Sequence, residues 1–116
     1  MDMCKEMENI VLCGANSYEQ KYYFNHDQFA SLPETIRQEL QIMCVLYTEE
    51  VGGVLTLEFT PDGELIFKSV ADDADYLFDE ISSGLKIRQM QREKRELLES
   101  LELYYRVFFL GEEAAE

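Results

Sequence analysis

The stretch VLTLEFTPDGELIF, residues 54–67, decides the fold of this chain. Its centre, Pro61-Asp62-Gly63, is a turn sequence, because proline presets the first turn angle and glycine accepts a positive φ. Alternation of apolar and polar residues on both sides of the turn is typical of strands with one buried face. The stretch therefore predicts an antiparallel β-hairpin whose inward residues are Leu55, Leu57, Phe59, Leu65 and Phe67.

A second hairpin is predicted nearer the N-terminus. Residues 10–13 are β-prone, residues 14–17 are rich in turn formers, and residues 18–24 alternate again. The segment Asn25-His-Asp-Gln28 then predicts a loop. Two hairpins favour an antiparallel sheet, in which their order stays open.

The segment between the hairpins predicts a helix over residues 32–50. Ser31 and Glu34 have the spacing of a capping box, and Pro33 suits a first helical turn. Gly52-Gly53 supplies a helix end. Apolar residues recur at helical spacing between these signals: Ile36, Leu40, Met43 and Tyr47, with Cys44 beside them.

The C-terminal third predicts one long helix or two shorter ones. Residues 72–110 contain no proline, and Asp72, Asp73, Asp75 and Asp79 suit the positive end of a helix dipole. A continuous helix over residues 75–109 would be about 52 Å long, whereas a domain of this size is roughly 35 Å across. The helix must project from the domain or break, and Ser82-Ser83-Gly84 is the expected break.

These elements predict an α+β fold of order β-β-α-β-β-α. We expect one antiparallel four-stranded sheet with helices packed on one face. The alternative packs the two pieces of a last helix broken near Ser82–Gly84 as an α-hairpin. The predicted domain covers residues 9–110, between a flexible leader at 1–8 and an acidic disordered tail at 111–116.

Charge and cysteine usage limit the classes of partner. The 24 acidic and 10 basic residues give a formal charge of -14, which repels nucleic acids and anionic membranes. We expect neither as a partner, and no membrane span. The N-terminus lacks the pattern of a signal peptide, and three widely spaced cysteines fit neither a disulfide framework nor a zinc site. A cytoplasmic location is expected.

No catalytic, cofactor-binding or metal-binding residues are predicted, and no cofactor is expected. His26 is the only histidine, and its neighbour Asp27 cannot orient it as a triad requires. The aspartates at residues 72–79 lack the order of an EF-hand loop. Cys44 is expected in the core.

The strongest functional signal is a basic segment at residues 86–95, which holds half of the positive charge. An apolar stripe with helical spacing follows it. We hypothesise that the two together bind a protein partner or a second copy, with the homodimer preferred. The candidate interaction residues are Lys86, Arg88, Arg92, Arg95, Leu97, Leu101, Tyr104, Tyr105 and Phe108.

Three segments carry a resemblance to a known family: VLCGANSYEQKYYFN (11–25), IMCVLYTEEVGG (42–53) and SLELYYRVF (100–108). They resemble an uncharacterised bacterial domain family of similar length. The resemblance implies a single-domain bacterial protein and no particular chemistry.

Three functions are compatible with the sequence. The first is a non-enzymatic protein-interaction or regulatory module acting as a homodimer. The second is a small acidic chaperone or adaptor, which resembles secretion chaperones in composition. The third is a ligand-binding protein or an enzyme whose Tyr, Asp and Glu groups come from remote segments.

Overall fold

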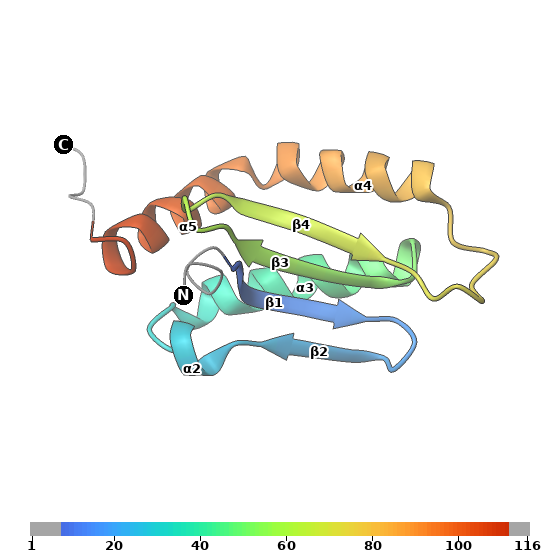
Figure 1. Cartoon of the computed structure of the whole chain (residues 1–116), viewed down its shortest axis with the longest axis horizontal. Coiled ribbons are helices and arrows are strands. Elements are labelled where there is room, and N and C mark those ends of the chain that lie inside the picture. The colour runs from blue at the N-terminus through green and yellow to red at the C-terminus, as the bar shows by residue number, and fades with distance from the viewer. Residues whose placement is uncertain (1–7, 112–116) are drawn as a thin grey trace.

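Four antiparallel strands form a sheet whose one face carries the helices (Figure 1). The computed structural model describes residues 8–111. The predicted leader and tail therefore lie outside the described residues, except for residues 8 and 111. The elements in chain order are β1 (Ile10–Asn16), β2 (Lys21–Phe24), α2 (His26–Phe29), α3 (Glu34–Glu50), β3 (Val54–Phe59), β4 (Leu65–Val70), α4 (Glu80–Glu93) and α5 (Arg95–Phe108).

The strand order is β2-β1-β3-β4, and every neighbouring pair is antiparallel. Both predicted hairpins form, although the first one turns at residues 17–20 instead of 14–17, because residues 14–16 pair within β1. The pairing of β1 with β3 joins the two hairpins. Cys13 lies opposite Leu57 at the centre of that pairing. The α+β class and the antiparallel four-stranded sheet are thus confirmed. The strand order, which the sequence left open, has β1 and β3 at the centre of the sheet.

The core lies between the sheet and the helices. Leu55, Leu57 and Phe59 are fully buried, as their alternation predicts. Helix α3 covers them with a buried stripe of its own, and α5 adds Tyr105, whose ring stacks on Phe59 at 4.2 Å between centroids. Packing of all three long helices on one face is therefore confirmed. The buried residues of α3 are Leu40, Met43, Cys44, Tyr47 and Thr48.

Two local predictions around the start of α3 are wrong. The N-cap of α3 is Pro33, without a side-chain cap, and Ser31 Oγ instead lies 2.7 Å from Tyr104 Oη of α5. The predicted loop at residues 25–28 contains the start of the short helix α2, whose N-cap Asn25 accepts a hydrogen bond from the Gln28 amide. The contact between Ser31 and Tyr104, which are distant in sequence, explains the first error, because it occupies the Ser31 hydroxyl that a capping box would use.

The last helical segment breaks, but at Lys94 instead of near Ser82–Gly84. Lys94 has φ −109° and ψ 25°, outside the helical region, and separates α4 from α5. The expected break at Ser82–Gly84 is wrong because Ser83 is buried there and bonds to Tyr47 Oη of α3. The bend at Lys94 lets α4 follow α3 while Tyr105 of α5 reaches Phe59.

Candidate interaction surface

The loop before α4 is tied down by side-chain hydrogen bonds. Tyr18, in the β1–β2 turn, donates its hydroxyl hydrogen to Asp75 Oδ2 at 2.6 Å, and the Tyr18 hydroxyl oxygen accepts from the Asp72 amide at 2.9 Å. Asp79 then caps α4 by accepting from Ser82 Oγ and from the Ile81 amide. Both hydrogen bonds lower the pKa of Asp79, and the hydrogen bond from Ser82 has the larger effect. The start of α4 is therefore an ordered part of the surface.

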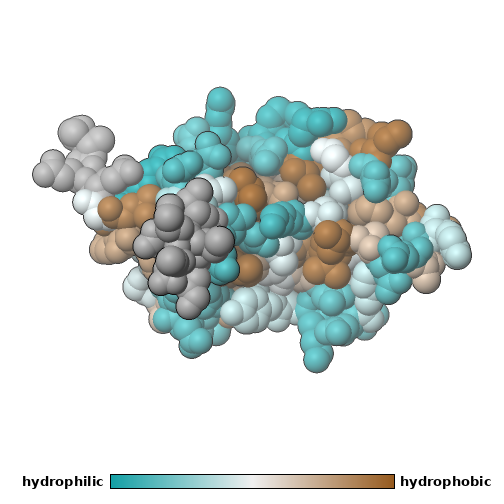
Figure 2. Space-filling view, in the orientation of Figure 1, coloured by the Kyte–Doolittle hydropathy of each residue, from teal (hydrophilic) through white to brown (hydrophobic). Residues whose placement is uncertain are grey.

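Large apolar side chains stand out from this ordered start. Leu77 is 94% exposed, Ile81 75% and Leu85 56%, and Tyr76 beside them is 92% exposed. Figure 2 shows hydrophobic atoms gathered at the upper right, over the start of α4. An exposed apolar group of this size is typical of an interaction surface. We call these four residues the apolar knob.

The two faces of α4 differ in character. Ser83 and Met90 are buried against the rest of the domain. At 100° per residue, Ile81, Leu85, Arg88 and Arg92 fall together on the opposite side. This outward stripe of α4 begins apolar and ends basic. The aspartates before α4, with Glu80 in its first turn, make the approach to the stripe acidic.

The basic segment divides into bound and free charges. Lys86 pairs with Glu50 at 2.8 Å and Lys94 with Glu39 at 3.5 Å, so both turn toward α3. Arg95 pairs with Glu99 at 3.6 Å on its own helix. Arg88 and Arg92 form no ion pair with any other residue between 8 and 111. The free positive charge of the segment therefore lies on the outward stripe of α4.

The candidate residues of α5 lie mostly within the fold. Leu101 and Tyr105 are buried, and Tyr105 also stacks on Phe109 at 4.8 Å. Leu97 and Tyr104 are half-buried against the same core. Phe108 is 73% exposed and remains accessible. Of the predicted interaction residues, Arg88, Arg92, Arg95 and Phe108 are thus the exposed ones.

Sequence reasoning missed the apolar knob. Its residues 77, 81 and 85 do show helical spacing, but Ile87 and Met90 define a second apolar stripe nearby. Only packing decides which of two stripes is buried, and here Met90 faces α3.

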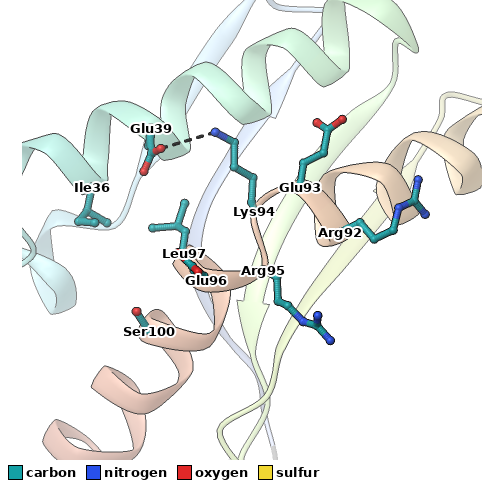
Figure 3. Close-up of a pocket in the computed structure, with 9 residues that line it drawn as sticks. All are labelled: Ile36, Glu39, Arg92, Glu93, Lys94, Arg95, Glu96, Leu97 and Ser100. Atoms are coloured by element: carbon teal, nitrogen blue, oxygen red, sulfur yellow. Dashed lines mark ion pairs between the residues drawn. The ribbon is translucent and has the colours of Figure 1, made fainter.

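A hollow of about 540 Å³ lies at the joint of α4 and α5 (Figure 3). Lys94 reaches across it to Glu39, while the side chains of Arg92 and Arg95 point away from α3. Glu39, Glu93 and Glu96 balance the three cations that line it. The hollow therefore offers neither a net charge nor a converging set of catalytic groups.

The other chemistry candidates are built into the structure. His26 is exposed, and its ring forms a T-shaped contact with the Phe24 ring. Cys13 and Cys44 are fully buried, with their sulfur atoms 3.9 Å apart. Hydrogen bonding to the Cys13 thiol and burial raise the pKa of Cys44. Among residues 8–111, no three His, Cys, Asp or Glu side chains gather in a way that could hold a metal ion.

Three of the seven tyrosines lie on the surface, and the others belong to the packing. Tyr18, Tyr23 and Tyr76 are exposed, whereas Tyr22, Tyr47, Tyr104 and Tyr105 contact or form the core. Within residues 8–111 the buried Tyr22 hydroxyl has no hydrogen-bond partner, and this burial raises its pKa. The tyrosines thus do not converge on one groove.

Fold and surface together define a small α+β domain with an ordered, exposed apolar helix start. A family model described as a family of unknown function (DUF6145) matches residues 9–113. The chain belongs to this family, which confirms its assignment to an uncharacterised domain family. No curated protein and no solved structure matches the chain. In the described part of the chain, no helix combines the length and the apolar character needed to cross a membrane.

Proposed function

We propose that this chain is a non-enzymatic protein-interaction module that acts as a homodimer in the cytoplasm. The observation that carries the proposal is the apolar knob on an ordered helix start, with Leu77 and Ile81 at 94% and 75% exposure. Burying such side chains is favourable by roughly 25 cal/mol per Å². Contact with a protein surface is the direct way to gain this free energy.

The surrounding charges support a protein partner. A formal charge of -14 opposes nucleic acid and anionic lipid. Two copies of this chain would repel each other as well, unless a basic patch meets an acidic one. Arg88 and Arg92 provide such a patch next to the apolar residues of the outward stripe of α4.

Sedimentation velocity over a range of concentrations tests the proposal. The unmodified chain is expected to sediment as a dimer that dissociates on dilution. Ile81→Glu should shift the equilibrium to monomer, because it places a charge in the apolar contact. Leu103→Glu is the matched control, since Leu103 is 49% exposed on α5 and outside the apolar knob. A strict monomer at every concentration would contradict the proposal.

A further inference from the structure

The two ends of α4 carry opposite charge. Asp72, Asp73, Asp75, Asp79 and Glu80 precede or begin the helix, while Arg88 and Arg92 lie on its second half. The apolar residues Ile81 and Leu85 lie between these ends. A helix with this distribution complements a copy of itself only when the copy runs in the opposite direction, because a parallel copy would place arginine beside arginine.

We infer that two copies of the chain associate through antiparallel contact of their outward stripes of α4. This inference rests on the proposed homodimer and specifies its interface. Leu85 lies near the two-fold axis, and Ile81 of each copy packs beside the Arg88 stem of the other. Each pair of arginines then faces the acidic approach to α4 in the second copy.

Helix geometry supports this register. With Leu85 opposite itself, position 81 meets position 89 of the other copy, and position 78 meets position 92. At a rise of 1.5 Å per residue, Arg88 and Arg92 are roughly 6 Å apart along the axis, so both lie beside the first turn and its preceding loop. The contact is self-complementary, as a two-fold interface requires.

The internal ion pairs leave the required charges available. Lys86 and Lys94 are held by Glu50 and Glu39 on α3, on the inward side. Asp73 and Glu80 are both exposed. Neither forms an ion pair within residues 8–111. The charges that the antiparallel contact uses are therefore those that the fold itself does not use.

Exchange of charges tests the inference. One variant carries Arg88→Glu with Arg92→Glu, and another carries Asp73→Lys with Glu80→Lys. Each variant alone should sediment as a monomer, because both contacts of its symmetric dimer become repulsive. An equimolar mixture should recover the dimer, since both contacts between unlike copies are attractive. Circular dichroism of each variant checks that α4 still forms.

A cysteine at the predicted axis gives an independent readout. In a Cys4→Ser chain, Leu85→Cys should form a disulfide-linked dimer under mild oxidation with oxidised glutathione. The control variant Leu103→Cys should form no disulfide-linked dimer.

The outcomes separate the two proposals. A dimer that neither crosslinks at position 85 nor responds to charge exchange would overturn the antiparallel contact and leave the homodimer. A chain that stays monomeric throughout would overturn both. Recovery of the dimer in the mixture, with crosslinking at position 85, would support both.

Discussion

The Tyr47 hydroxyl lies 2.6 Å from Ser83 Oγ, and this contact joins α3 to α4 inside the domain. The same hydroxyl lies 2.6 Å from Ser69 Oγ of β4, so three elements meet at one oxygen. Ser83 Oγ also donates to Ser69 Oγ at 3.2 Å. This hydroxyl triad fixes the inward side of α4 and thereby determines which stripe of the helix faces outward.

Tyr47→Phe should destabilise the domain. The substitution keeps the ring but removes the oxygen that both serines contact, and buried polar groups that lose a partner cost about 1 to 3 kcal/mol. Because the two serines still bond to each other, we expect a loss of about 1 kcal/mol in the free energy of unfolding. Urea denaturation measures it. Tyr23→Phe, on an exposed ring, is the control and should change nothing.

Two glycine substitutions should have opposite effects. A Cβ at Gly84 would meet no atom within 4 Å, so Gly84→Ala should stabilise α4 by about 0.5 to 1 kcal/mol. Gly53 has φ +75°, and its Cβ would lie 2.7 Å from the Val70 carbonyl oxygen. Gly53→Ala should therefore destabilise the domain by more than about 1 kcal/mol. Thermal unfolding distinguishes the two.

Gly52→Ala separates the two causes at the α3–β3 connection. Gly52 has φ +92°, but a Cβ added there would have open space around it. Gly52→Ala therefore introduces backbone strain without a steric clash. We expect Gly52→Ala to destabilise the domain less than Gly53→Ala does. Equal losses at the two positions would show that strain alone matters there.

Glu58 should make the domain sensitive to acid. Burial raises the pKa of its carboxyl, but hydrogen bonds from Asn9, Thr56 and Lys68 outweigh this and hold it below the ordinary value. A lowered pKa in the folded state contributes stability above the unfolded pKa of about 4.3. That contribution is lost as the pH falls through the folded value.

Glu58→Gln tests this linkage. Its unfolding free energy should vary less between about pH 5 and pH 3 than that of the unmodified chain. Glu64→Gln, at an exposed position in the β3–β4 turn, should retain the original pH profile. Identical profiles for all three chains would refute the assignment to Glu58.

The buried thiols should resist alkylation in the folded state. Cys13 and Cys44 have no exposed surface, and a raised pKa keeps Cys44 protonated at neutral pH. We expect iodoacetamide to modify neither residue until the chain is unfolded. Mass spectrometry of the peptides measures this. Rapid modification of Cys44 in the native protein would mean that α3 separates readily from β1.

The hairpins and α3 could be predicted because their signals are local. The alternation around Pro61-Asp62-Gly63 contains both strands and the turn. The order of the strands could not be predicted in this way, because the pairing of Cys13 with Leu57 depends on contacts between distant segments. The length of the last helical segment indicated only that it must project from the domain or break.

The position of that break and the exposure of the apolar knob depend on tertiary contacts, so they could not be predicted from the sequence. Lys94 is a good helix former, and the chain bends there because Tyr105 stacks on Phe59 while α4 stays on α3. Gly84 is a poor helix former, yet its neighbour Ser83 is held by Tyr47. The same contacts leave Ile81 and Leu85 outside, which periodicity alone does not reveal.

The central place of β1 in the sheet has a consequence for synthesis on the ribosome. Among the four strands described here β1 is made first, yet its partner β3 ends only at Phe59. Until then, one edge of β1 is available for pairing with other chains. The sheet closes late, after α3 has been made, and formation of the β1–β3 pairing is expected to limit the rate of folding. Nascent chains in which synthesis has not yet passed Phe59 should therefore depend most on chaperones for protection.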